Sequence, residues 1–292
     1  MSDFVVNLIA PPGKLATSDV EGLRSAWAGK ALRWLAPDQA AEFSIPAVPP
    51  DRWERWSDLQ EHSIDLVVQP AEGRRKRLLL ADMDSTMIQQ ECIDELAEMA
   101  GVGARVKAIT AQAMDGALNF EEAMRARVAL LKGLPEQVIG SVLADRITYT
   151  PGGAVLLATM KAHGAYTALV SGGFTAFTEA VAAHLGFDMH RANVLGIAED
   201  QLTGLVEEPV LGQQSKIDVL DTLTAKLGIT DDQVIAVGDG ANDLGMLGRA
   251  GLGVALHAKP TVAQACHVRI NFGDLTALLF LQGYTSEAFV TS

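Results

Sequence analysis

The stretch Leu78-Leu79-Leu80-Ala81-Asp82-Met83-Asp84-Ser85-Thr86 decides the fold. Its apolar residues lead directly into two carboxylates, Asp82 and Asp84, which are separated by a single residue. A short, continuous apolar run is typical of a strand buried on both faces of a parallel sheet, and such sheets bind ligands at the carboxyl ends of their strands. The stretch therefore predicts a central strand with two acids in the ligand-binding crevice. Taken alone, a strand followed by a polar turn explains the same residues.

Short apolar runs alternate with helical segments after residue 76, which predicts an α/β fold with a doubly wound parallel sheet. Helices are expected to end before Gly164, Gly186 and Gly228, since glycine readily takes the left-handed conformation that ends a helix. A smaller β-pair is expected from residues 191–197 and 202–206. The strands expected in the parallel sheet are Arg77–Ala81, Thr167–Val170, Val234–Val237, Gly253–Ala255 and Val268–Ile270.

The segment between the first two expected strands shows helical patterns and no strand signal. We expect it to form a helical cap inserted after the first strand, at about residues 87–150. Asn119 followed by Glu122 predicts a capping box at the start of one helix. The expected helices are Glu91–Met99, Arg105–Met114, Asn119–Leu131 and Pro135–Asp145.

Residues 1–72 differ in character from the rest of the chain, and all four tryptophans lie among them. Val5–Ile9 and Ile64–Val68 are expected strands that flank helical stretches. The predicted organisation is therefore a small N-terminal α+β module, residues 1–72, followed by the main domain, residues 73–292.

The composition argues against nucleic-acid and membrane partners and favours a cytoplasmic location. A net charge of -13 repels a phosphate backbone, so nucleic acid is not an expected partner. No run approaches the roughly 18 apolar residues of a membrane span, so no membrane partner is expected. Cys92 and Cys266 form no CxxC pair, which favours reduced thiols and a cytoplasmic location. The histidines lack zinc-binding spacing, so any metal is expected to be a hard cation bound by carboxylates.

A second acidic cluster follows another expected strand, in Val237-Gly238-Asp239-Gly240-Ala241-Asn242-Asp243. An Asx-rich helix start, with Asn242 as its cap, explains these residues when they stand alone. Placed at the same end of the sheet as Asp82 and Asp84, however, the cluster supplies further carboxylate oxygens. Such a donor set predicts a Mg²⁺ site.

Two further features indicate phosphate binding. Ser171 and Gly172 end an expected strand ahead of a helix, where backbone N–H groups and the helix dipole favour an anion. Lys216 opens the expected helix Lys216–Leu227, where its charge opposes the helix dipole and so indicates a task other than helix stability. A glycine-rich turn and a surface lysine explain these features when each is taken alone.

In this order, the four features resemble the motifs of the haloacid dehalogenase (HAD) superfamily. The first motif is matched by Asp82–Thr86, the second by Ser171, the third by Lys216 and the fourth by Gly238–Asp243. Over roughly residues 78–270 the chain further resembles the phosphoserine phosphatases, through Glu91, Leu118-Asn119-Phe120-Glu121, Arg127 and Val170-Ser171-Gly172-Gly173-Phe174. The resemblance implies hydrolysis of O-phosphoserine to serine and phosphate, the last step of serine biosynthesis.

The resemblance also implies roles for the site residues. Asp82 would be the nucleophile that forms an aspartyl-phosphate, and Asp84 the general acid and base. Mg²⁺ would be bound by the side chains of Asp82 and Asp239 and by the Asp84 backbone carbonyl, and Asp243 and Asn242 would orient its shell and the substrate. Ser171, Gly172 and Lys216 would hold the phosphoryl group, Glu91 the substrate ammonium and Arg127 its carboxylate. Met114 and Phe120 are candidates for an apolar lid, although an ordinary place in a helical core explains either residue when taken alone.

Several alternatives stay open. A related phosphotransferase, such as one acting on homoserine, or another small-metabolite phosphatase would use the same chemistry. A non-enzymatic phosphate-binding protein is a further alternative, against which the retention of Asp82, Asp84, Lys216 and Asp239 argues. The sequence is also compatible with a homodimer and with an N-terminal module that is a divergent relative of the ACT regulatory module.

Overall fold

The quoted apolar stretch forms β5 (Leu78–Ala81), near the middle of a six-stranded parallel sheet of order β12-β11-β10-β5-β6-β7. The computed structural model describes residues 4–114 and 117–291. The predicted α/β fold is confirmed, and all five predicted strands belong to this sheet. Its other strands are β6 (Tyr166–Phe174), β7 (Met189–Asn193), β10 (Val234–Gly238), β11 (Leu252–Leu256) and β12 (Val268–Ile270).

Alternate residues of β5 face two different helical layers. Leu79 and Ala81 belong to the apolar cluster that includes α7 (Gly153–Ala162), α8 (Thr175–Leu185) and α12 (Ala277–Leu281). Leu78 and Leu80 pack in a second cluster with α9 (Gln213–Leu227) and α10 (Leu244–Arg249). Because β6 and β10 lie on opposite sides of β5, the strand order reverses there and creates a crevice at the carboxyl ends of the strands.

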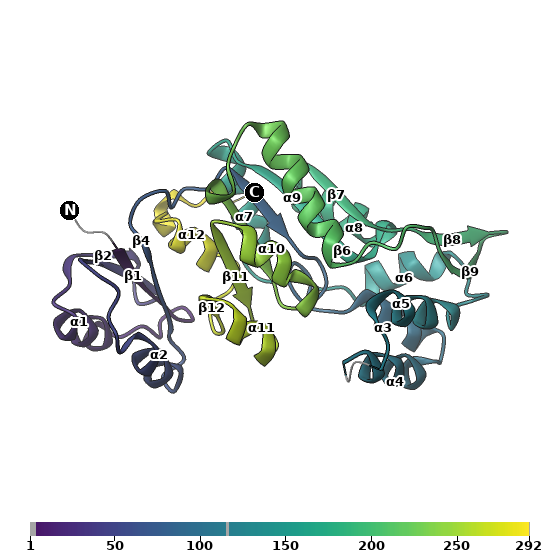
Figure 1. The fold of residues 1–292 in the computed structure, drawn as a ribbon, viewed down its shortest axis with the longest axis horizontal. Helices are drawn as coiled ribbons and strands as arrows, with labels where there is room; N and C mark the ends of the chain where they lie inside the picture. Colours follow the sequence, from purple (N-terminus) through teal and green to yellow (C-terminus); the bar gives the residue numbers. More distant parts are fainter. Residues whose placement is uncertain (1–3, 115–116, 292) are drawn as a thin grey trace.

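The prediction of a β-pair over residues 191–197 and 202–206 is wrong in part. Residues 191–193 belong to β7, an edge strand that pairs in parallel with β6. Only β8 (Leu195–Ala198) and β9 (Gln201–Val206) form an antiparallel ribbon, which extends toward the cap (Figure 1). β7 is polar and only half covered, so it lacks the continuous apolar run from which parallel strands are predicted.

Four helices occupy the predicted cap segment, at the right of Figure 1: α3 (Cys92–Met99), α4 (Gly103–Met114), α5 (Phe120–Ala129) and α6 (Gln137–Asp145). The predicted capping box is present at the start of α5, where Asn119 and Glu122 bond each other's backbone N–H groups at 2.9 and 3.0 Å. No helix within residues 4–114 and 117–291 is long and apolar enough to cross a membrane.

The cap is joined to the sheet by two chain segments that pair with each other. The Gln89 N–H donates to the Thr148 carbonyl at 2.9 Å, and the Thr150 N–H donates to the Met87 carbonyl at 3.0 Å. Between these bonds Ile88 faces Tyr149 in an isolated antiparallel bridge. The entrance and the exit of the cap therefore form one narrow two-stranded link.

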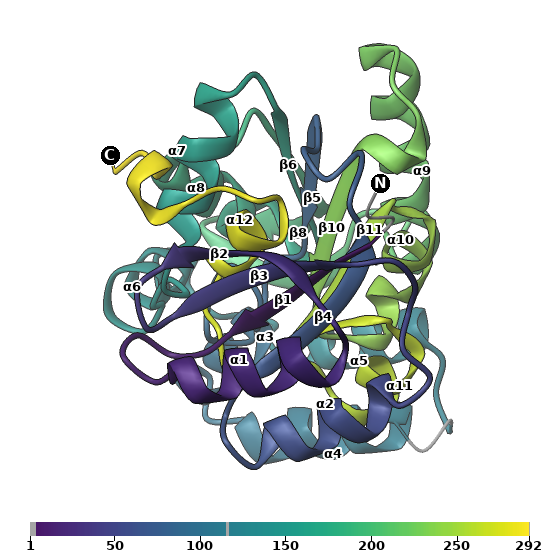
Figure 2. The same ribbon diagram turned by 90° about the vertical axis from the view of Figure 1, so that its left-hand side faces the viewer.

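Residues 4–70 form a separate antiparallel sheet of order β2-β3-β1-β4. One face is covered by α1 and α2, and the other lies toward α12 (Figure 2). The two predicted strands, which are the first and the last of this module in the chain, are present. The prediction missed the hairpin of two strands that lies between them in sequence. The elements are β1 (Phe4–Ile9), α1 (Thr17–Ala26), β2 (Lys30–Ala36), β3 (Ala40–Ile45), α2 (Arg52–Gln60) and β4 (Asp65–Pro70), a ferredoxin-like βαββαβ succession.

A buried carboxylate fastens this N-terminal sheet to the main domain. Asp65, at the start of β4, accepts the backbone N–H groups of the loop after β12, those of Asn271, Phe272 and Gly273, at 2.8, 3.1 and 2.9 Å. Burial raises the pKa of Asp65 to about 6, although these hydrogen bonds act in the opposite direction. The loop thus depends on Asp65 for its backbone hydrogen bonds.

Candidate active site

Asp82 lies in a buried charge cluster at the carboxyl end of β5. The Lys216 Nζ is 2.6 Å from the Asp82 Oδ1 and 2.5 Å from the Asp243 Oδ1, and the Lys216 side chain is only 1% exposed. Burial lowers the pKa of Lys216, but the two carboxylates outweigh this effect and raise it above its ordinary value. The lysine therefore stays charged. It lies in the first turn of α9, which begins three residues earlier than predicted, at Gln213.

Carboxylate oxygens of Asp82, Asp239 and Asp243 lie within 4.8 Å of one another, and all three residues are buried. Burial, followed by repulsion from Asp243, raises the pKa of Asp82 and brings that of Asp239 to about 6. Lys216 and the exposed Lys259, whose Nζ lies 4.0 Å from the Asp239 Oδ2, do not together neutralise three carboxylates, so the cluster fits a hard divalent cation bound by oxygen. Of the predicted metal ligands, the Asp82 and Asp239 side chains come together here, and the role of the Asp84 carbonyl stays a prediction.

Two hydrogen bonds hold these carboxylates in place. The Thr86 hydroxyl donates to the Asp239 Oδ1 at 3.3 Å, and the Gly240 N–H donates to the Asp243 Oδ2 at 3.0 Å. The prediction did not single out Thr86, although it ends the stretch that decides the fold. Its hydroxyl is fully buried, so its bond to Asp239 is shielded from water.

Asp84 lies at the entrance to the cap. Its Oδ1 accepts the Cys92 N–H at 3.3 Å, and a Cβ atom on Gly173 would lie only 2.8 Å from its Oδ2. Burial, followed by the charge of Glu91, raises the pKa of Asp84 to about 7. A carboxyl group with a pKa near neutrality can both donate and accept a proton, which suits a general acid and base.

Ser171 and Gly172 lie beside this acidic cluster, on β6. The strand was expected to end at Val170 but continues through Phe174, so both residues belong to the strand itself and not to the glycine-rich turn that was the alternative explanation. The Ser171 hydroxyl accepts the Gly173 N–H at 2.8 Å. A Cβ atom on Gly172 would lie 3.7 Å from the Asn242 Nδ2, so these two residues face each other. The prediction that Asn242 caps a helix is wrong, because the cap of α10 is Asp243.

Asn193 is a buried residue that the sequence did not single out. Its Nδ2 donates to the carbonyls of Gly172 and Leu211, at 2.8 and 3.1 Å, and its Oδ1 accepts the Leu211 N–H at 2.6 Å. Asn193 thereby connects β6, the strand of Ser171 and Gly172, to the loop that leads to Lys216. Nothing in the local sequence signals this task, because only the pairing of β7 with β6 brings Asn193 to the site.

Glu91 and Arg127 approach from the cap. The Ser85 hydroxyl donates to the Glu91 Oε1 at 2.8 Å, and the Arg127 Nε donates to the Ala123 carbonyl at 3.2 Å. Burial lowers the pKa of Arg127, although Asp94, Glu91 and Asp84 act to raise it. Within residues 4–114 and 117–291, Arg127 forms no ion pair.

Phe120, the first residue of α5, joins the cap to the sheet side of the site. Cβ atoms built on Gly172 and Gly212 would each lie 3.2 Å from its ring. The ring therefore packs against both glycines. Through this contact the cap touches β6 and the residue before α9. The side chain of Met114, the other predicted lid residue, lies outside the described residues.

Comparisons with known proteins agree with this geometry. Residues 79–248 match the haloacid dehalogenase-like hydrolase family. The chain is 41% identical over 255 residues to a phosphoserine phosphatase of Streptomyces coelicolor, which covers 86% of this chain but only 62% of that relative. Its fold is similar to that of a HAD family hydrolase from Salmonella enterica, with a TM-score of 0.85, 33% identity, and coverage of 96% of this chain and 98% of that one.

A phospho-aspartyl intermediate analogue of a phosphoserine phosphatase is also similar, with a TM-score of 0.66, 41% identity, and coverage of 70% of this chain and 98% of that one. The predicted resemblance to the HAD superfamily and its phosphoserine phosphatases is thereby confirmed. The matched residues include Asp82, Lys216 and Asp239, which the structure brings to one end of the sheet. The chain therefore belongs to the haloacid dehalogenase-like hydrolase family.

Proposed function

We propose that the protein is a magnesium-dependent phosphatase that hydrolyses O-phosphoserine to serine and phosphate through an aspartyl-phosphate. The observation that carries this proposal is the 2.6 Å ion pair between Asp82 and Lys216. It fixes a buried carboxylate at a strand end, next to a cation that can neutralise phosphoryl oxygens. Phosphate esters hydrolyse very slowly without such positioning and charge neutralisation.

In the first step, an Asp82 oxygen attacks phosphorus in line with the serine oxygen, and the bond between phosphorus and that oxygen breaks. Asp84 gives its proton to the departing oxygen, so serine leaves as a neutral alcohol. The product on the protein is an acyl phosphate, the mixed anhydride of the Asp82 carboxyl group and phosphate. Lys216 and the N–H of Gly172 stabilise the charge on the phosphoryl oxygens.

In the second step, Asp84 accepts a proton from a water molecule as that water attacks phosphorus. The bond between phosphorus and Asp82 breaks, phosphate leaves, and the Asp82 carboxylate is restored. Asp84 is then protonated again and ready for the next turnover. One carboxyl group thus serves both steps, for which a pKa of about 7 is suitable.

Mg²⁺ would be held by the side chains of Asp82 and Asp239 and by the Asp84 carbonyl. When bound, it neutralises negative charge shared between these carboxylates and the phosphoryl group. Asp243 and Asn242 would orient this region. Thr86 would keep the Asp239 carboxylate turned toward the metal through its 3.3 Å hydrogen bond.

The charges on the cap suit the amino-acid end of phosphoserine. Arg127 offers a planar fork to a carboxylate, and no protein carboxylate within the described ranges lies within 4.0 Å of it. Glu91 offers a carboxylate to the ammonium group. Both residues belong to the cap. Glu91 acts to raise the pKa of Asp84, and Asp84 acts to raise the pKa of Arg127, which supports a role for both residues near the proposed reacting centre.

Phosphate release from O-phospho-L-serine by the full chain tests the proposal. With Mg²⁺ we expect one serine for each phosphate, and in excess EDTA we expect no release above the uncatalysed rate. Undiminished release in EDTA would refute the metal site. Failure to release phosphate from phosphoserine while other phosphate esters are cleaved would refute the assigned substrate.

The same assay with added homoserine separates the phosphatase from a phosphotransferase. Water and an alcohol would attack the same aspartyl-phosphate, so only the acceptor differs between the two reactions. We expect the yield of inorganic phosphate to be unchanged by homoserine. A phosphorylated homoserine product in stoichiometric amount would favour the phosphotransferase instead.

A further inference from the structure

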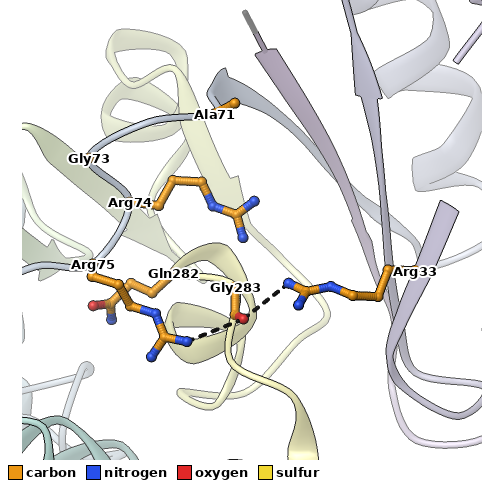
Figure 3. Close-up of a pocket in the computed structure, with 7 residues that line it drawn as sticks. All are labelled: Arg33, Ala71, Gly73, Arg74, Arg75, Gln282 and Gly283. Atoms are coloured by element: carbon orange, nitrogen blue, oxygen red, sulfur yellow. Dashed lines mark hydrogen bonds between the residues drawn. The ribbon is translucent and has the colours of Figure 1, made fainter. Parts of the chain in front are cut away.

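Three arginines converge on a cavity of about 450 Å³ between the N-terminal module and the main domain (Figure 3). Arg33 comes from β2, and Arg74 and Arg75 come from the segment between β4 and β5. Gln282 and Gly283, which follow α12, complete most of the lining. Because Arg74 and Arg75 precede β5, the cavity lies at the amino end of the strand whose carboxyl end carries Asp82.

The positive charge of this cavity exceeds the negative charge that faces it. Glu42 pairs with two of the arginines, its Oε1 lying 2.6 Å from the Arg33 Nη2 and its Oε2 lying 2.8 Å from the Arg74 Nη2. Within residues 4–114 and 117–291, no carboxylate lies within 4.0 Å of the Arg75 guanidinium. That group instead lies 3.2 Å from the centre of the Tyr284 ring. Three guanidinium groups therefore share one carboxylate, in a chain whose net charge is -13.

The arginines also hold unused hydrogen-bond donors. The Gly283 carbonyl accepts from the Arg33 Nη2 at 3.2 Å and from the Arg75 Nη2 at 3.4 Å, as Figure 3 shows. Arg74 donates to Glu42 at 2.8 Å. The Arg33 Nε also donates to the Glu42 Oε1, at 3.0 Å. Each guanidinium carries five N–H groups, and within residues 4–114 and 117–291 Arg75 donates only to the Gly283 carbonyl, so this arginine in particular keeps donors for a ligand.

The backbone of Gly283 makes room for this arrangement. Its φ of 75° lies in the left-handed region, and a Cβ atom there would collide with the Arg74 guanidinium. A side chain at this position would therefore displace Arg74 from the cavity. Glycine serves two needs here, the turn after α12 and the approach of an arginine.

We propose that this cavity binds a small anion with at least two negative charges, carried by phosphate or carboxylate groups. Several guanidinium groups around one open space form the arrangement that recognises such anions by paired N–H bonds. This site is separate from the proposed catalytic site, at the opposite end of β5. Its residues come from the N-terminal module, the connecting segment and the chain after α12, so a bound anion holds these three parts together.

Calorimetric titration of inorganic phosphate, and separately of citrate, into the full chain tests this proposal. The titrations are done in EDTA at constant ionic strength. We expect saturable binding to the wild type and at least about tenfold weaker binding to Arg75→Gln, because a charged hydrogen bond is lost. Arg191→Gln is the matched control: it removes the same charge from an exposed position on β7 and should leave the affinity unchanged.

Arg75→Gln and Arg191→Gln should both keep the wild-type phosphatase rate and circular dichroism spectrum. If Arg75→Gln does not fold, Arg75→Lys replaces it, and weaker binding is again expected because a lysine lacks the planar fork. Equal affinities of the wild type and the Arg75 variant, or no binding of either anion, would overturn the proposal. Binding lost in Ser171→Ala but kept in Arg75→Gln would place the anion in the catalytic site and overturn it as well. Citrate binding without phosphate binding would support the carboxylate form of the ligand.

Discussion

Asp82 lies between a cation and two further carboxylates, and this balance determines its reactivity. Lys216 contacts both Asp82 and Asp243, so its single charge is shared between them. With Asp239, the cluster holds three carboxylates against the single buried charge of Lys216, so about two negative charges remain, which a divalent cation would offset. We therefore expect the metal to bind first and to make room for the negative charge of a phosphoryl group.

Asp82→Asn is expected to lower kcat by at least about 10⁴-fold, since removal of a nucleophile has effects of that size or larger. The amide is a poor nucleophile and cannot form the aspartyl-phosphate. Mass spectrometry after rapid quenching should find phosphate on Asp82 of the wild type and none on the variant. Phosphate on any other residue would contradict the assignment. Asp84→Asn is the companion variant, which should slow both formation and breakdown of the labelled form.

Arg127→Ala is expected to lower kcat/KM for phosphoserine by about 10-fold to 100-fold, because the substrate carboxylate loses a charged hydrogen bond. Hydrolysis of a simple aryl phosphate, which has no carboxylate, should change little. Parallel kinetics with both substrates measure the difference. An equal loss with both would mean that the cap does not recognise the amino acid. Arg125→Ala, on the exposed side of α5, is the control and should affect neither substrate.

Asp82, Ser171 and Asp239 could be predicted as site residues from the sequence because each follows an apolar run. Their order along the chain matches the motifs of a known superfamily. Asn193 and Thr86 could not, for a physical reason. Their hydrogen bonds reach Gly172 and Asp239, residues far away in the chain, and only the finished sheet makes them neighbours. The assigned catalytic and substrate-binding roles themselves stay predictions.

At the level of elements, β7 contributes to the site through Asn193. Asn193 bonds the end of β6 and the loop before α9, the two elements that carry Ser171 and Lys216. The edge strand therefore sets the spacing between Ser171 and Lys216, the two side chains proposed to bind phosphate. The polar sequence of β7 hid the strand from prediction, but it supplies the amide side chain that makes these hydrogen bonds.

Asn193→Ala is expected to lower kcat/KM by about tenfold or more, because it leaves a buried N–H and two carbonyls without partners. The loss should appear mainly in kcat, since Lys216 and Gly172 stabilise charge that develops during the reaction. Asn193→Asp, which keeps an acceptor for the Leu211 N–H but loses the donor, should be intermediate. A lower melting temperature with unchanged kcat would show that Asn193 only stabilises the fold.

Strands with continuous apolar sequences were predicted well, and polar strands were not. β5 and β10 are buried apolar runs, which local sequence reveals. β2 alternates exposed and half-buried residues over most of its length, with a register shift against β3, so its strand signal is weak. The start of α9 was placed late because no side chain caps it.

On the scale of the whole molecule, Asp65 connects the pH of the medium to the stability of the joint between the module and the main domain. Its folded pKa is about 6, against an ordinary value of 3.8. As the pH rises from about 4 to about 6, the unfolded chain therefore releases this proton before the folded chain does. Folding then becomes less favourable with rising pH, and the stabilisation present at low pH is lost by the time Asp65 ionises in the fold.

The comparison of wild type with Asp65→Asn tests this expectation, because the amide cannot ionise. The free energy of unfolding of the wild type, minus that of the variant, should fall by about 2 kcal/mol between pH 4.5 and pH 6.5. Urea denaturation at several pH values measures it. A difference that is constant or rises with pH would contradict the shifted pKa. Asp58→Asn, on the exposed end of α2, should show no such trend.

The division of the chain into modules could be expected from composition, but the way they join could not. The Asp65 contacts and the Gln69 side chain, which donates to the Leu281 carbonyl at 2.9 Å, link residues more than two hundred positions apart. No local pattern encodes such pairs. The ACT-like character of the N-terminal module stays a prediction. Anion binding at the arginine-lined cavity on its border would show whether the module takes part in binding a ligand.

The two-stranded link between cap and sheet has a kinetic consequence. Because Gln89 and Met87 pair with Thr148 and Thr150, both connections would bend together, so we expect any movement of the cap to be that of one body. Because the Phe120 ring packs against Gly172 and Gly212, the cap lies against the site, so we expect the proposed substrate to enter, and phosphate to leave, only while the cap is open. Each turnover then includes one full swing, so added viscosity should slow it.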